Sequence, residues 1–117
     1  MKVLLINGSP NREGCIHTAL SEVAATLQAN DIETEMLYLG KKPIAGCIAC
    51  GKCLDTGCCF REDLVQEIQR RLDEFDGLVI GSPVYYSGPS GQLVSFLNRL
   101  FYATERRMAG KVGAAVV

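Results

Sequence analysis

Cysteine is the residue type in this sequence with the clearest capacity for chemistry. The chain has six cysteines, and five of them lie between Gly40 and Phe60. This stretch has no regular hydrophobic period, so we expect a long functional loop. In a reducing compartment, clustered thiols indicate metal binding or redox chemistry more often than structural disulfides.

The segment from Gly8 to Thr18 is a second candidate for chemistry, because it leads directly into a helix. A phosphate needs several converging donors, and helix amides can supply them together with Ser9, Thr18 and the basic residues Arg12 and His17. The segment lacks the glycine spacing of a dinucleotide fingerprint and the Gly-Lys-Ser/Thr of a nucleotide P-loop, which favours a monophosphate. The alternative is an ordinary turn in which Thr18 caps the helix.

The segment from Gly81 to Pro89 is the third candidate. It places Tyr85 and Tyr86 in an extended stretch whose turns are permitted by glycine. Main-chain amides there suit the polar edge of a flat conjugated ring, and aromatic or apolar surface suits its face. The alternative is that the paired tyrosines are packing residues.

Hydrophobic patterning predicts the elements that position these segments. Short apolar runs predict strands over residues 2–6, 33–39, 78–80 and 112–117. Apolar residues at helical spacing predict helices around residues 20–27, 64–75 and 93–100. This alternation indicates an α/β fold with a doubly wound parallel sheet. Such sheets bind ligands beyond the carboxyl ends of their strands, where the first and third loops lie.

Length and composition exclude several classes of protein. At 117 residues, with 48% hydrophobic and 21% charged residues, the chain is expected to form one globular domain. A net charge of -1 leaves no broad basic face for nucleic acid. No apolar run approaches the ~20 residues that span a bilayer, and the run at Val3–Ile6 is too short for a signal peptide. We therefore expect a cytoplasmic protein that binds neither nucleic acid nor membrane.

Taken together and in order, four motifs resemble the NADPH-dependent FMN reductase family over essentially the whole chain. They are Asn7-Gly8-Ser9-Pro10, the cysteine loop, Gly81-Ser82-Pro83-Val84-Tyr85-Tyr86 and Phe96-Leu97-Asn98-Arg99. The similarity is greatest to the cysteine-containing, flavodoxin-like members. It implies a flavodoxin-like sheet with strand order 2-1-3-4.

The resemblance also implies a function. Family members bind FMN as dimers and use NAD(P)H to reduce it or a bound acceptor, which here would be a small molecule or a redox protein. The implied phosphate contacts are Ser9, Asn11, Arg12, His17 and Thr18, and the implied ring contacts are Pro83, Val84, Tyr85, Tyr86, Ser87 and Gly88. No catalytic side chain is expected, because hydride transfer is the chemistry of the cofactor.

The chain departs from the family pattern at two places. His17 stands where the family usually has an asparagine, and the chain stops at Val117. Family members are similar in having a further loop, strand and helix after the fourth strand. We therefore expect residues 1–117 to form a single flavodoxin-like domain that lacks these last elements, with its fourth strand at the sheet edge. A non-catalytic truncated fragment is an alternative interpretation.

The cysteine loop resembles the compact motif of iron-sulfur flavoproteins, which are relatives of this family. The resemblance implies the ligands Cys47, Cys50, Cys53 and Cys59, with Cys58 as an alternative to the last. The first three have the spacing of ferredoxin ligands. An electron carrier with an iron-sulfur cluster is therefore an alternative function. Reduced thiols or a labile disulfide remain open, as does zinc, which is disfavoured because structural zinc sites usually join two separated ligand pairs.

Overall fold

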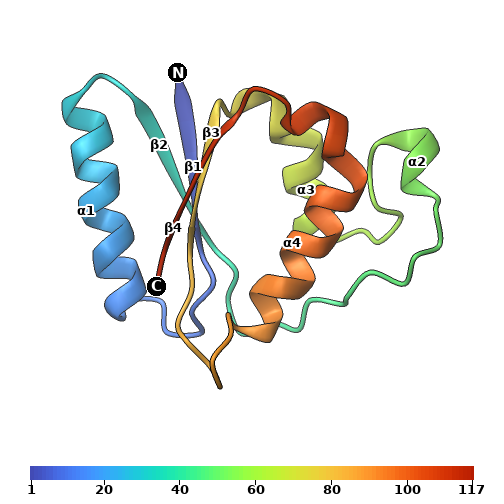
Figure 1. Cartoon of the computed structure of the whole chain (residues 1–117), viewed down its shortest axis with the longest axis horizontal. Helices are drawn as coiled ribbons and strands as arrows, with labels where there is room; N and C mark the ends of the chain where they lie inside the picture. Colours follow the sequence, from blue (N-terminus) through green and yellow to red (C-terminus); the bar gives the residue numbers. More distant parts are fainter.

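Four parallel strands form the centre of the chain in a computed structural model that describes residues 1–117 (Figure 1). They are β1 (Lys2–Asn7), β2 (Glu33–Tyr38), β3 (Gly77–Gly81) and β4 (Val112–Val116). Their order in the sheet is β2-β1-β3-β4, and every neighbouring pair is parallel. The expected doubly wound sheet is confirmed, together with its strand order.

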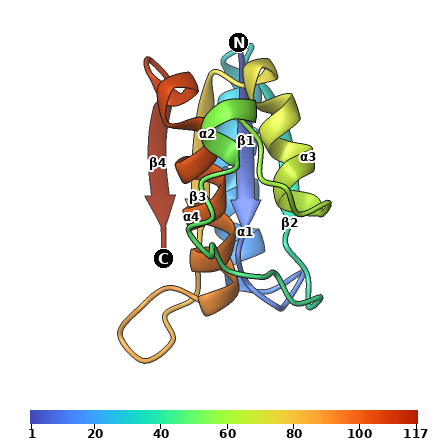
Figure 2. The same ribbon diagram turned by 90° about the vertical axis from the view of Figure 1, so that its right-hand side faces the viewer.

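The helices are divided between the two faces of the sheet. They are α1 (Cys15–Ala29), α2 (Cys53–Thr56), α3 (Leu64–Arg71) and α4 (Gly91–Thr104), and short 3-10 turns at Leu72–Glu74 and Glu105–Met108 follow α3 and α4. Figure 1 shows α1 on one face and α3 with α4 on the other, and in Figure 2 α2 lies outside α4. No helix has both the length and the apolar character needed to cross a membrane.

One local expectation from the sequence and one of its alternatives were wrong. The cysteine loop is not wholly irregular, because α2 forms a short helix within it. Thr18 does not cap the first helix, which begins at Cys15 with Gly14 at its N-cap. Thr18 lies inside the helix, and its hydroxyl donates to the Gly14 carbonyl at 3.3 Å.

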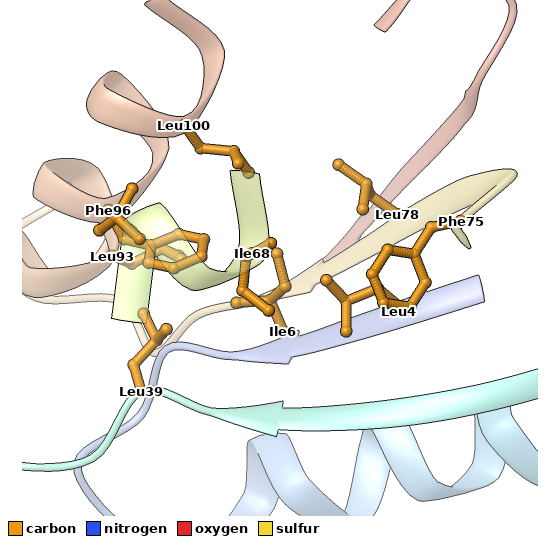
Figure 3. Packing of buried hydrophobic residues seen from close by; sticks show 10 residues of the cluster. Leu4, Ile6, Leu39, Ile68, Phe75, Leu78, Leu93, Phe96 and Leu100 are labelled. Carbon is orange, nitrogen blue, oxygen red and sulfur yellow. The ribbon is translucent and has the colours of Figure 1, made fainter. Parts of the chain in front are cut away.

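Alternate residues of β1 enter two separate cores. Leu4 and Ile6 are buried against α3 and α4, in the cluster drawn in Figure 3. Val3 and Leu5 point to the opposite face and pack against Leu20 of α1. This burial on both faces explains why the strand reads as a continuous apolar run.

An ion-pair network joins β1, β2 and the end of α3. The Arg71 guanidinium donates to both carboxylate oxygens of Glu35, at 2.9 and 2.7 Å, and Lys2 lies 3.2 Å from the same carboxylate. Hydrogen bonds from Arg71 hold the pKa of Glu35 below its ordinary value of 4.5. The network therefore contributes stability while Glu35 is ionised.

Gly81 provides the first test of this packing. A Cβ atom there would lie 2.6 Å from Cγ2 of Ile16 and 2.9 Å from Cδ1 of Leu20. Because α1 would have to move away from the sheet, Gly81→Ala is expected to lower the free energy of unfolding by about 1 to 3 kcal/mol, measured by urea denaturation. Gly113→Ala in β4 is the matched control, since a Cβ there meets nothing within 4 Å. Equal stability of the two variants would contradict this packing.

Glu35 provides a test with a pH dependence. Its folded pKa is lowered, so its contribution is complete above pH 4.5 and is lost as the pH falls through the folded pKa. Glu35→Gln should therefore cost about 1 kcal/mol of unfolding free energy near pH 7 and progressively less in acid. Denaturation across this pH range measures the difference. The control is Glu22→Gln, an exposed glutamate on α1, which should have no effect at any pH; a cost of Glu35→Gln that persists in acid would contradict the assignment.

Candidate functional site

A hydrogen bond joins the two loops that were predicted to bind a ligand. The amide of Gly8, just after β1, donates to the carbonyl of Gly81 at the end of β3, at 2.8 Å. A Cβ at Gly8 would lie 2.9 Å from Leu93 and 3.0 Å from the Gly81 oxygen, so only glycine permits this approach. The expectation that the two turns lie side by side is confirmed.

Ser90, the N-cap of α4, forms hydrogen bonds to both of these loops. Its hydroxyl donates to the Gly8 carbonyl at 2.7 Å and accepts from the Leu93 amide at 3.4 Å. Its own amide donates to the Ser82 hydroxyl at 3.0 Å. One buried residue therefore caps a helix and contacts the first loop with its side chain, and it contacts Ser82 in the second loop with its backbone amide.

Asn7 and Ser9 shape the first loop from within. The side chain of Asn7, which is buried at the end of β1, accepts from the Ser9 amide at 2.9 Å and donates to the Arg12 carbonyl at 3.4 Å. The Ser9 hydroxyl in turn accepts from the Asn11 amide at 3.1 Å. These hydrogen bonds turn the chain back on itself between β1 and α1. None of them uses an amide of the first turn of α1, so those amides are available to a ligand.

The N-terminus of α1 lacks the internal capping that the other long helices have. Gly14 at its N-cap has no side chain, and the amides of Cys15, Ile16 and His17 donate no hydrogen bond within the chain. By contrast, Asp63 caps α3 and Ser90 caps α4. Free amides at the positive end of a helix dipole attract anions, and a phosphate suits this arrangement.

The predicted phosphate contacts surround these amides. Arg12 and Thr18 are exposed, Asn11 is exposed on the loop, and His17 is half-buried on the first turn of α1. The structure brings all of them to the same loop and helix terminus as Ser9, although the Ser9 hydroxyl is engaged within the loop.

Tyr38, at the end of β2, supports this loop and was not predicted. Its hydroxyl donates to the Pro10 carbonyl at 2.5 Å, and the Arg12 guanidinium lies 5.3 Å from the centre of its ring. This stacking holds a cation beside the free helix amides. Only the position of Tyr38 at the carboxyl end of a predicted strand pointed towards a site.

The second loop is a tight two-residue hairpin. Tyr85 and Gly88 exchange hydrogen bonds at 2.8 and 3.1 Å, and the residues between them have positive φ angles, 49° at Tyr86 and 65° at Ser87. Non-glycine residues adopt this backbone at a cost, and such strain concentrates where a ligand is held. The amides of Val84, Tyr86 and Ser87 donate no bond within the chain and suit the polar edge of a ring.

The cysteine loop forms a pocket, partly open to solvent, that shares no lining residue with these two loops. Cys47, Cys50, Cys53 and Cys59 all line it, together with Arg99 and Tyr102. Burial raises the pKa of the Cys53 thiol, and the neighbouring thiols of the other three cysteines act in the same direction. These four sulfurs therefore share one environment.

Cys58 is outside this pocket. It lines only a neighbouring surface hollow, with Lys52, Asp55 and Arg70, whereas Cys59 lines both hollows. The backbone of its neighbour Cys59 is clamped, since the Cys59 amide donates to Gln69 at 2.7 Å and its carbonyl accepts from Gln66 at 2.8 Å. Of the two alternatives for a fourth ligand, the geometry favours Cys59.

The arrangement of the thiols distinguishes between kinds of metal site. No three His, Cys, Asp or Glu side chains converge closely enough to hold a single metal ion. A mononuclear zinc site requires such convergence. An iron-sulfur cluster is larger and attaches its cysteines to separate irons, so four thiols around a pocket fit its donor set.

Comparison with known proteins gives a consistent family. The family model described as NADPH-dependent FMN reductase matches residues 1–117. An iron-sulfur flavoprotein of Methanocaldococcus jannaschii is 39% identical over 99 residues, which are 85% of this chain and 51% of that protein. An iron-sulfur flavoprotein of Archaeoglobus fulgidus is 32% identical over 118 residues, 100% of this chain and 54% of that protein. The chain thus spans about half the length of these relatives.

Solved structures agree on the fold. The apo form of an NADH:FMN oxidoreductase matches with a TM-score of 0.67 at 22% identity, covering 97% of this chain and 57% of that one. A structure described as a putative quinone reductase from Klebsiella pneumoniae matches with a TM-score of 0.64 at 15% identity, covering 86% and 45%. With the fold, the paired loops and a family match over its whole length, the chain belongs to the NADPH-dependent FMN reductase family.

Proposed function

We propose that residues 1–117 act as a single FMN-binding domain of an NAD(P)H-dependent oxidoreductase. The observation that carries the proposal is the hydrogen bond between Gly8 and Gly81, which sets a loop with free helix amides beside a loop with free hairpin amides. As the family resemblance implies, the domain works as a homodimer or higher oligomer and passes electrons to a small molecule or a redox protein. FMN, when bound, supplies the hydride chemistry between NAD(P)H and that acceptor.

The phosphate of FMN is proposed to lie at the N-terminus of α1. The amides of Cys15, Ile16 and His17 point to this site, and no acidic residue occupies the first turn of α1. Arg12, held over the Tyr38 ring, adds a positive charge that is free of any ion pair within the chain. Asn11 and Thr18 are polar neighbours in the same loop and helix turn.

The ring of FMN is proposed to lie against residues 83–88. The rigid hairpin presents the amides of Val84, Tyr86 and Ser87 at fixed positions, which orients the polar edge of the ring. Pro83, Tyr85 and Gly88 supply the remaining surface of the loop. The role of these residues is to orient the ring and leave one face open to nicotinamide.

A second candidate function is an electron carrier with an iron-sulfur cluster on the cysteine loop. It is favoured by the four thiols that line one pocket, Cys47, Cys50, Cys53 and Cys59. The names of the relatives from M. jannaschii and A. fulgidus support this candidate. The two functions are compatible, because the pocket and the flavin loops use different residues.

The phosphate site is tested by comparing FMN with riboflavin, which lacks the phosphate. Wild-type protein should bind FMN more tightly in a fluorescence titration and oxidise NADPH when FMN and an acceptor are present. Arg12→Ala should weaken FMN binding about tenfold, because it removes a charge-assisted contact, and should leave riboflavin binding unchanged. Arg106→Ala, which removes an exposed arginine beyond the far end of α4, is the control. Equal affinity for both flavins in wild type would refute the phosphate site.

The cysteine pocket is tested by a pair of neighbouring substitutions. After anaerobic reconstitution with iron and sulfide, wild type and Cys58→Ser should carry equal iron and sulfide, because Cys58 lies outside the pocket. Cys59→Ser should lose most of both, since it removes a ligand. Iron and acid-labile sulfide assays with the visible spectrum measure the outcome. A larger loss in Cys58→Ser than in Cys59→Ser would show that the ligand is misassigned.

A further inference from the structure

Arg99 is the one arginine whose side chain is buried in this chain. It lies in the third turn of α4 and is only 2% exposed. Its guanidinium donates to both carboxylate oxygens of Asp63, at 2.5 and 2.8 Å, and to the Ala45 carbonyl at 3.1 Å. A charge is costly to bury, and these bonds offset the cost without explaining why an arginine is needed here.

The Nε–H of Arg99, which Asp63 and Ala45 do not use, faces the cysteine pocket. This N–H points at Sγ of Cys59, with an N···S distance of 3.4 Å. Arg99 itself lines the pocket beside Cys47, Cys50 and Cys53. Of the four cysteines, only Cys59 receives a bond from a charged side chain, whereas Cys47 accepts from the backbone amide of Ala49 at 3.4 Å.

The geometry of the Arg99 contact is fixed from several sides. Gln69 donates to the Arg99 carbonyl at 2.8 Å and accepts from the Cys59 amide at 2.7 Å, so it connects the backbones of both residues. Asp63 holds the guanidinium from the other side and also caps α3. Although Cys59 lies in the loop between α2 and α3, its backbone is therefore bound to α3 and, through Gln69, to Arg99 of α4.

The ion pair between Arg99 and Asp63 keeps both side chains in their charged forms. Burial alone would lower the pKa of Arg99, but the bonds to Asp63 and Cys59 outweigh it and raise the pKa. Burial would likewise raise the pKa of Asp63, and the bonds from Arg99 lower it instead. The guanidinium beside Cys59 thus stays positively charged at ordinary pH values.

We propose that Arg99 is a positioning residue that holds Cys59 at the pocket and raises the reduction potential of a cluster bound there. The inference rests on the proposed iron-sulfur site and extends it to a residue that is not a ligand. One-electron reduction adds one negative charge to the metal site and its sulfur ligands. An N–H donor on a ligand sulfur stabilises that charge, and a directed hydrogen bond from a buried guanidinium is a strong one of this kind.

The test is a potentiometric titration of reconstituted protein, with dithionite as the electron donor. Arg99→Lys keeps a positive charge for Asp63 but loses the directed N–H to Cys59, so the midpoint potential should move to a more negative value. Asp63→Asn keeps an oxygen to cap α3 and leaves the Arg99 charge less compensated, so the potential should move to a more positive value. Shifts of opposite sign are not expected from two variants that merely loosen the fold.

Arg71→Lys is the matched control. Arg71 also makes a two-pronged contact with a carboxylate, that of Glu35, but it does not line the cysteine pocket. The midpoint potential of Arg71→Lys should equal that of wild type. Circular dichroism and iron content should be measured for every variant, so that potentials are compared only between folded, loaded proteins.

The outcomes separate the two proposals. Opposite shifts in Arg99→Lys and Asp63→Asn, with none in Arg71→Lys, would support the role of Arg99. Equal potentials in all loaded variants would overturn that role and leave the cluster site standing. A wild-type protein that binds no iron after reconstitution would overturn the cluster site and this inference with it.

Discussion

The hydrogen bond from the Gly8 amide to the Gly81 carbonyl is the contact on which the proposed flavin site depends. Parallel pairing of β1 with β3 brings both strand ends to one edge of the sheet, and the absence of a Cβ at Gly8 lets the two loops touch. Ser90 fixes the same junction from α4. This junction sets the free amides at the start of α1 and those of the hairpin at residues 84–87 on loops that leave the same edge of the sheet.

Most of the fold was predictable from the sequence because its strands are buried on both faces. Continuous apolar runs identify β1 and β3, and helical spacing of apolar residues identifies α1, α3 and α4. The start of α1 was misjudged, because Gly14 is a weak signal and Thr18 is a common cap that here lies inside the helix. Helix α2 has only four residues, CLDT, without an apolar period, so patterning had no means of detecting it.

The two loops of the site were predictable from the sequence, but the long-range hydrogen bonds that support them were not. Ser9, Arg12 and the paired tyrosines stand in recognisable local motifs, whereas Tyr38 and Arg99 reach their partners from distant parts of the chain. The choice between Cys58 and Cys59 likewise depends on which side of the chain faces the pocket. Spacing along the sequence cannot decide such questions, because long-range contacts define them.

Helix α4 contacts both proposed redox sites, the flavin loops and the cysteine pocket. Ser90 at its start holds the flavin loops, and Arg99 in its third turn holds Cys59. Arg99 lies nine positions after Ser90, which is roughly 13 Å along a helix axis. Figure 3 shows that Phe96, between them, packs into the core with Leu93 and Leu100. The core that fixes α4 against the sheet therefore fixes both the flavin loops and the Cys59 side of the cysteine pocket, so a disturbance of this packing reaches both sites.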